Sequence, residues 1–141
     1  MMKLSTKGRY GLRAIAELAA RSDKPDPVPL AAIAQKQNIS EKYLESMFSM
    51  LKKARLIRSV KGAGGGYVLA RDAKNIMVSE VLRVLEGDLH IVDDEHYAEA
   101  NNPLWCLTKK MVWDTVHDRV SGVLSSSSLE DLIKSKQQTD N

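Results

Sequence analysis

The sequence has little cysteine, few aromatic residues and no long hydrophobic run. Its one cysteine, Cys106, excludes an intramolecular disulfide and is typical of a reducing compartment. No run approaches the roughly 18 apolar residues that a membrane span needs, and the N-terminus has no apolar secretory segment. We therefore expect a cytoplasmic protein with no membrane partner.

The sequence also lacks the residue patterns of common enzymes. It has no H-x-x-x-H pair for a metal and no motif that joins a nucleophile to its base. The glycine-rich stretch KGAGGG, residues 61–66, lacks the G-x-x-x-x-G-K-[ST] spacing of a nucleotide-binding loop, and a strand rather than a helix is expected after it. These absences argue against an enzyme.

Charge is divided unevenly along the chain. Residues 1–71 contain 14 Lys and Arg against 5 Asp and Glu, a net charge of +9. Residues 72–141 contain 7 against 13, a net charge of −6. The first half is therefore predicted to bind a polyanion, while the second half has another role.

Hydrophobic spacing and breaker residues predict a mainly α-helical chain with one β-hairpin. The predicted helices span residues 5–21, 30–37, 40–54, 78–86 and 103–124, and a short helix capped by Ser127 or Ser128 follows. The predicted strands, 56–60 and 67–69, flank the tip KGAGGG. The predicted organisation is a winged helix-turn-helix domain over 1–87, an acidic loop over 88–102, a dimerisation helix and a short C-terminal helix over 103–134, and a frayed tail over 135–141.

The helix predicted over 40–54 has the features of a DNA-recognition helix. Ser40 is placed to cap it, and a buried stripe is predicted from helical spacing at Leu44, Met47, Phe48 and Leu51. In a winged helix-turn-helix, the start of this helix touches base edges and a basic hairpin grips the backbone. The predicted DNA-binding residues are Ser40, Lys42, Tyr43, Glu45, Lys52, Arg58, Lys61, Gly62 and Gly64. The alternatives are a plain surface helix and hairpin, or a winged helix that binds only proteins.

Three stretches carry a family resemblance: KLSTKGRYGLRAIAELA, ISEKYLESMFSMLKKARL and RSVKGAGGGYVLAR. Together they resemble the Rrf2 family of bacterial winged-helix transcription regulators, which includes IscR-, NsrR- and CymR-like members. The resemblance implies a homodimeric regulator, usually a repressor, that binds a partly palindromic operator in double-stranded DNA. Two positions depart from the family pattern. Arg55 stands where glycine is common, so a left-handed helix cap there is expected to be strained or absent, and Ala63 stands where proline is frequent.

The cysteine content separates this chain from the cluster-binding members of the family. Those members carry three cysteines before the long helix, whereas here only Cys106 remains, at the position of the third. Lys109 stands where one branch has a histidine ligand. Thiolates hold iron–sulfur clusters, so we expect no cofactor. The alternatives are a site that combines Cys106 with His90, Asp94, Glu95 or His96, redox sensing through Cys106, or a thiol with no sensing role.

The cysteine-poor, CymR-like branch is the most similar in character, because VSEVLRVLEG and SSLEDL resemble its segments. That branch implies control of cysteine or sulfur metabolism, and a protein partner such as cysteine synthase.

The long helix over 103–124 carries an apolar stripe at i, i+4, i+8 and i+11. The stripe consists of Val112, Val116, Val120 and Val123. Helix-to-helix pairing in a symmetric homodimer would bury it, and packing on the same chain is the alternative.

Overall fold

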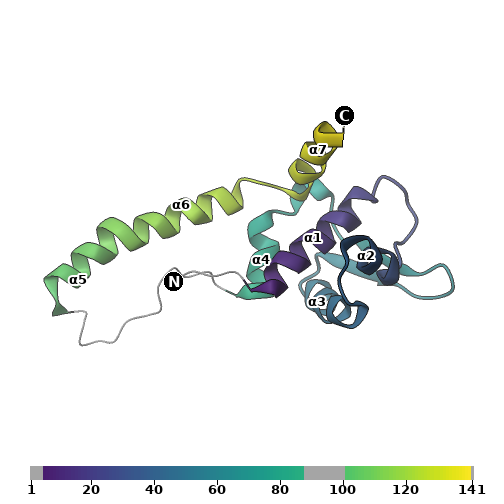
Figure 1. The fold of residues 1–141 in the computed structure, drawn as a ribbon, viewed down its shortest axis with the longest axis horizontal. Coiled ribbons are helices and arrows are strands. Elements are labelled where there is room, and N and C mark those ends of the chain that lie inside the picture. Colours follow the sequence, from purple (N-terminus) through teal and green to yellow (C-terminus); the bar gives the residue numbers. More distant parts are fainter. Residues whose placement is uncertain (1–4, 88–100, 141) are drawn as a thin grey trace.

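The computed structural model describes residues 5–87 and 101–140, which form a mainly helical fold with one β-hairpin (Figure 1). The predicted fold class is confirmed. The elements are α1 (Thr6–Ala20), α2 (Leu30–Gln37), α3 (Glu41–Lys53), β1 (Ile57–Val60), β2 (Gly66–Leu69), a 3-10 turn (Ala73–Asn75), α4 (Val78–Glu86), α5 (Pro103–Thr108), a π-helical segment (Lys109–Trp113), α6 (Asp114–Ser125) and α7 (Leu129–Asp140). No helix in these ranges is long and apolar enough to span a membrane.

Helices α1 to α4 pack around one hydrophobic core. The stripe predicted on α3 is fully buried, since Leu44, Met47, Phe48 and Leu51 all have 0% exposure. The other helices contribute Ala14, Ile15, Leu18 and Ala19 from α1, Ile33 and Ala34 from α2, and Val81 and Leu85 from α4. Burying a large apolar side chain contributes roughly 1.5–3 kcal/mol, so this core fixes how α3 is presented.

Two left-handed turns set the ends of α2 and α3. Asn38 ends α2 with φ 55° and ψ 51°, as predicted. Arg55 ends α3 with φ 63°, and the N–H groups of Arg55 and Leu56 donate to Lys52 O and Leu51 O at 3.0 Å each. This is the Schellman pattern, so the left-handed cap is present. Of the two outcomes expected at Arg55, a strained cap or no cap, the structure has the strained cap, because a residue with a Cβ is strained in the left-handed conformation.

A one-residue β-bridge outside the two strands holds the hairpin to the rest of the domain. Strands β1 and β2 pair antiparallel from Ile57↔Leu69 to Val60↔Gly66. Val28 in the loop before α2 pairs with Tyr67 through two backbone hydrogen bonds of 2.9 Å. A Cβ on Gly66, whose φ is +157°, would collide with the carbonyl of Val28, so this position requires glycine.

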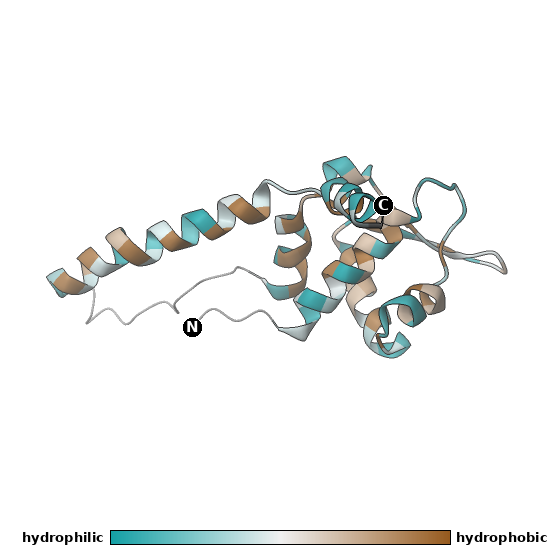
Figure 2. Ribbon diagram, turned by 45° about the horizontal axis from the view of Figure 1, so that its top comes forward, coloured by the Kyte–Doolittle hydropathy of each residue, from teal (hydrophilic) through white to brown (hydrophobic). Residues whose placement is uncertain are grey.

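The long helix extends away from the winged-helix domain (Figure 1). The sequence predicts one α-helix over 103–124, but the structure interrupts it with the π-helical segment Lys109–Trp113. Hydrophobic residues recur along α5 and α6 (Figure 2). The predicted acidic loop lies, except for its last two residues, outside the described residues, as do the candidate ligands His90, Asp94, Glu95 and His96.

The last helix is longer than the sequence predicts. Its predicted cap is confirmed at Ser128, whose hydroxyl accepts the N–H of Asp131 at 3.2 Å, while the Asp131 carboxylate accepts the N–H of Ser128 at 2.9 Å. Leu129 is fully buried in the core. Helix α7 continues through Asp140, so the tail predicted to be frayed over 135–141 is helical as far as the structure describes it. The cap at Ser128 and the buried Leu129 stabilise the first turn of α7, and the later turns of the helix are polar.

Candidate nucleic-acid interface

The start of α3 presents polar side chains to solvent. The N–H of Tyr43 donates to the Ser40 hydroxyl at 3.1 Å, so Ser40 is the helix cap that the sequence predicts. Ser40, Lys42 and Glu45 are exposed, and Tyr43 is half-buried. The buried stripe on the opposite side of α3 fixes this orientation. One face of the helix start is therefore available to a ligand such as a DNA groove.

Tyr43 is held in place by residues of α1. Its hydroxyl lies 3.3 Å from Thr6 Oγ1, and its ring meets that of Tyr10 edge-on with centroids 6.3 Å apart. The Arg13 guanidinium lies 4.9 Å from the centre of the Tyr10 ring and donates to the carbonyl of Gln37 at 2.8 Å. Sequence patterns do not reveal this cluster, because Thr6 and Tyr10 reach Tyr43 only through the packing of α1 against α3.

A carboxylate at the end of α4 fixes the start of α1. Glu86 Oε1 accepts the backbone N–H groups of Ser5 and Gly8 at 3.0 and 2.8 Å, and it also accepts the Ser5 hydroxyl. A negative charge at a helix N-terminus satisfies unpaired N–H groups and complements the helix dipole. Glu86 thus positions the turn that carries Thr6, next to Tyr43.

The hairpin tip projects a lysine from a tight turn. The N–H of Gly65 donates to the carbonyl of Gly62 at 3.0 Å, and Gly62 has φ +108°, a conformation that favours glycine. Lys61, Gly62 and Gly64 are all exposed, and no atom lies within 4 Å of where a Cβ on Gly62 or Gly64 would be. The open backbone of the tip allows close approach to another backbone.

A basic groove connects the end of α3 to the hairpin. It has a volume of about 730 Å³ and is lined by Lys52, Ala54, Arg55, Ile57, Arg58, Ser59, Ala70 and Arg71. All four charged lining residues are basic. Two of them, Lys52 and Arg58, are among the DNA-binding residues predicted from the sequence. Arg55 is not among those residues, because the sequence marks it only as a departure from the family's glycine. The signal that could have found it is the run of positive charges from Lys52 onward.

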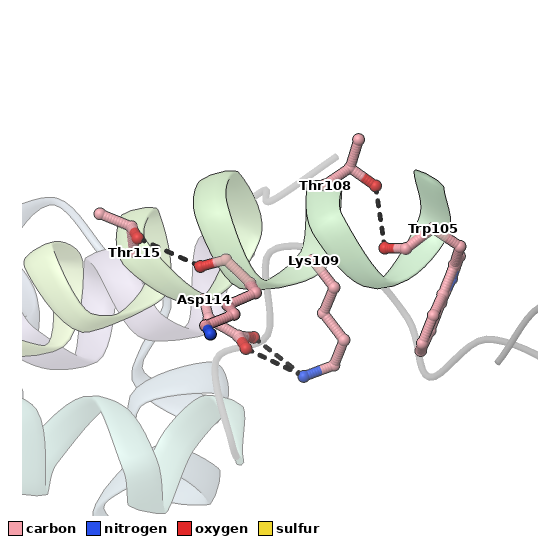
Figure 3. Close-up of polar contacts among 6 residues, drawn as sticks. Trp105, Thr108, Lys109, Asp114 and Thr115 are labelled. Carbon is pink, nitrogen blue, oxygen red and sulfur yellow. Dashed lines mark hydrogen bonds and ion pairs between the residues drawn. The ribbon is translucent and has the colours of Figure 1, made fainter. Parts of the chain in front are cut away.

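No set of metal ligands surrounds Cys106 among the described residues. Cys106 lies in α5 and is exposed. No group of three or more His, Cys, Asp or Glu in residues 5–87 and 101–140 is placed to hold a metal ion. The Lys109 ammonium is bound by both carboxylate oxygens of Asp114, at 3.1 Å each (Figure 3). A protonated, ion-paired amine has no lone pair to donate to a metal.

The π-helical segment makes this ion pair possible. Lys109 and Asp114 are five residues apart, and the hydroxyl of Thr115 likewise reaches the carbonyl of Lys110, five residues back, at 3.4 Å (Figure 3). Five-residue spacing aligns side chains in a π-turn rather than in an α-helix.

The described residues do not fit an iron–sulfur cluster. Such clusters are held by several cysteine thiolates, and the chain has one cysteine.

The chain matches a family model and many known regulators over nearly its whole length. The model described as "Rrf2: Iron-dependent Transcriptional regulator" matches residues 4–135. The regulator IscR of Photorhabdus laumondii is 40% identical over 139 residues, which cover 99% of this chain and 84% of that protein. CymR of Bacillus subtilis is 42% identical over 134 residues, which cover 93% of this chain and 89% of that protein.

Two solved structures have the same fold. The structure of T. potens IscR has a TM-score of 0.79 at 37% identity and covers 99% of this chain and 92% of that chain. The structure of CymR, described as the global cysteine regulator of B. subtilis, has a TM-score of 0.74 at 41% identity and covers 95% and 98%. These relatives are transcriptional regulators and not enzymes, as the absence of enzyme motifs predicts. The winged-helix fold, the basic groove and these matches establish that this chain belongs to the Rrf2 family of transcriptional regulators.

Proposed function

We propose that this chain is a cytoplasmic, homodimeric repressor that binds a partly palindromic operator in double-stranded DNA. The observation that carries the proposal is the basic groove between the end of α3 and the hairpin, together with the exposed polar residues at the start of α3 and the exposed Lys61 at the hairpin tip. Clustered positive charge binds the phosphate backbone by releasing counterions. The exposed polar residues at the start of α3 then supply contacts to base edges.

The roles divide between reading and gripping the duplex. Ser40, Lys42, Tyr43 and Glu45 lie at the start of α3 and are assigned to base edges. Lys52, Arg58 and Lys61, with the backbone at Gly62 and Gly64, are assigned to phosphates. Glu45 repels phosphates, so we assign it a selective role, accepting from a cytosine amine and rejecting other bases.

The long helix supports a homodimer. Among the described residues, seven of the nine exposed large hydrophobic side chains lie between positions 104 and 123: Leu104, Leu107, Met111, Val112, Trp113, Val116 and Val123. Helix α6 contacts α4 of its own chain, yet these side chains are left open to solvent. Exposed apolar side chains gathered along one helix are typical of an interaction site. A two-fold pair of long helices would bury it and place two α3 helices on successive turns of DNA.

The regulated genes are proposed to belong to cysteine or sulfur metabolism. Support comes from the segments VSEVLRVLEG and SSLEDL and from the single cysteine, which fit the CymR-like branch better than cluster-binding members. A protein partner such as cysteine synthase stays a prediction from the family resemblance.

The input signal is proposed to be something other than an iron–sulfur cluster. One alternative is an iron–sulfur or metal site formed by Cys106 and non-cysteine ligands. A second alternative is redox sensing by the exposed Cys106. Anaerobic reconstitution with iron and sulfide, followed by an absorbance spectrum and metal analysis, tests the cluster or metal alternative. We expect a colourless protein without stoichiometric iron, and a stable visible absorption band would contradict the proposal.

Specific DNA binding is tested by fluorescence anisotropy with a duplex from the chain's own promoter region and a scrambled duplex of the same length. We expect tighter binding to the promoter duplex, and affinity that falls steeply as salt rises. Equal, weak binding to both duplexes would overturn the specific-regulator proposal. A winged helix that binds only proteins would show no salt-dependent binding to either duplex.

A further inference from the structure

A second cavity adjoins the basic groove at the base of the hairpin. It has a volume of about 380 Å³ and is lined by the end of α1, the loop before α2, the hairpin and residues 70–73. It shares Arg58, Ala70 and Arg71 with the basic groove. Arg58 and Arg71 therefore line both cavities. Whatever occupies one alters the charges available to the other.

The lining of this cavity combines an apolar floor with a charged rim. Leu18 and Val28 are 1% and 7% exposed and form part of the floor. The rim carries four basic residues and two acidic ones: Arg21, Lys24, Arg58, Arg71, Asp26 and Asp72. The cavity is therefore a half-open, largely polar hollow whose charged groups lie at defined positions, which suits a polar small molecule.

Two of the rim cations have no ion-pair partner in the described part of the chain. Arg21 pairs with Glu17 at 3.0 Å, and Arg71 pairs with Glu80 at 3.2 Å. Lys24 and Arg58 have no such pair among residues 5–87 and 101–140. These two side chains line the same cavity from different elements, Lys24 from the loop before α2 and Arg58 from β1. Their charges are the ones available to an anionic ligand.

We propose that this cavity binds a small organic anion that also carries hydroxyl or amino donors, and that the bound anion competes with DNA. The anion would be held by Lys24 and Arg58, while its donors reach Asp26 or Asp72. The volume lies within the range of small-molecule sites and is large for an inorganic ion. The competition rests on the proposed DNA-binding function, because Arg58 and Arg71 also line the basic groove.

The coupling has a defined sign. An anion that neutralises Arg58 removes a phosphate contact, so DNA affinity falls when the cavity is filled. Because linkage is reciprocal, DNA must lower the affinity for the anion by the same factor. The cavity would thus act as an input for a metabolite, separate from Cys106.

The experiment uses the full chain and three probes: citrate, L-glutamate and glycerol 3-phosphate. Calorimetry without DNA measures binding of each probe, with inorganic phosphate and potassium chloride at matched ionic strength as controls. We expect saturable binding of at least one probe, one per chain, and weaker DNA binding by anisotropy when that probe is present. The matched variants are Lys24→Gln, which alters only the cavity, and Lys52→Gln, which alters only the basic groove.

The two variants are expected to behave in opposite ways. Lys24→Gln should weaken probe binding by about tenfold or more, since it removes a hydrogen-bonded charge, and leave DNA affinity without probe unchanged. Lys52→Gln should weaken DNA binding and leave probe binding unchanged. Thermal melting of each variant checks that the fold is intact.

Three results would overturn the inference. The first is no saturable binding of any of the three probes. The second is equal probe binding by Lys24→Gln and the unaltered chain. The third is loss of DNA affinity in Lys24→Gln without any probe, which would make Lys24 a phosphate contact. If the chain bound no DNA at all, the proposed function would fail while calorimetry still reported on the cavity.

Discussion

The winged-helix domain, residues 5–87, buries its hydrophobic stripe, whereas the long helix, residues 103–125, leaves its own largely exposed. In the domain, the stripe on α3 is fully buried against α1, α2 and α4. In the long helix, Val112, Val116 and Val123 are 42%, 40% and 67% exposed. The hydrophobic residues of the domain are thus buried within one chain, whereas those of the long helix leave apolar side chains exposed. Under the proposed function, the domain binds DNA and the long helix pairs two copies of the chain.

The largest expected effect comes from the core of the domain. Phe48→Ala removes a fully buried side chain that meets the Tyr67 ring edge-on at 5.1 Å. We expect the free energy of unfolding to fall by about 3–5 kcal/mol, measured by chemical denaturation. A loss below about 1 kcal/mol would show that α3 is not anchored by this core.

The next effect concerns the long helix. Val116→Glu places a charge in the apolar surface, so we expect a monomer by sedimentation velocity and DNA affinity lower by roughly 100-fold, because two linked half-sites no longer bind together. Val116→Ala keeps an apolar side chain at the same position and should retain most of the dimer. An unchanged mass for Val116→Glu would show that this helix does not form the interface.

Substitutions of Glu45 and Lys61, two residues proposed to contact DNA, should have different effects, one on sequence preference and the other on affinity for all duplexes. Glu45→Ala should change which base is preferred at one operator position, at a cost of about 1–3 kcal/mol for the original operator. Lys61→Ala should weaken all duplexes alike and lower the slope of log affinity against log salt by about 1. Anisotropy titrations over a panel of single-base variants check both. Identical behaviour of the two variants would contradict the division into reading and gripping.

Arg55 allows a further separation of stability from binding. Arg55→Gly relieves a left-handed conformation and should raise the free energy of unfolding by about 1 kcal/mol. It also removes one cation from the basic groove, so DNA affinity should fall. Arg55→Lys keeps the charge and the strain and serves as the control. Weaker DNA binding without added stability would show that the cap is not strained.

The smallest effect is the pH dependence of the α7 cap. Hydrogen bonds from the backbone and side chain of Ser128 hold the pKa of Asp131 below its usual value. The cap is therefore complete above the ordinary carboxylate pKa and is lost as pH falls through the lowered one. We expect helicity of α7, followed by NMR shifts, to decline only at acidic pH. Asp131→Asn should remove this dependence, and an unchanged profile would contradict the cap.

Much of the domain was predictable because its signals are local. The stripe on α3, the left-handed Asn38 and the Ser40 cap each follow from spacing or from the preference of one residue. The hairpin likewise follows from two short strand patterns on either side of the glycine-rich tip. The roles of the predicted DNA-binding residues remain predictions, since the structure shows their exposure and not their contacts with DNA.

What escaped prediction depends on packing between distant segments. The Glu86 carboxylate caps α1 from 78 residues away along the chain, and Val28 joins the hairpin from another loop. The π-helical segment arises inside a helix whose α-helical spacing looks ordinary. Helix α7 continues through Asp140, although the weak apolar periodicity of its second half does not indicate a helix.

In vitro selection from a randomised duplex library, with the full chain at near-physiological salt, tests the central claim most directly. The account predicts enrichment of a partly palindromic motif whose two halves lie about 10 base pairs apart, or a multiple of that, centre to centre. It also predicts that Val116→Glu loses the second half of the motif. No enriched motif, or a single half-site selected by the unaltered chain, would contradict it.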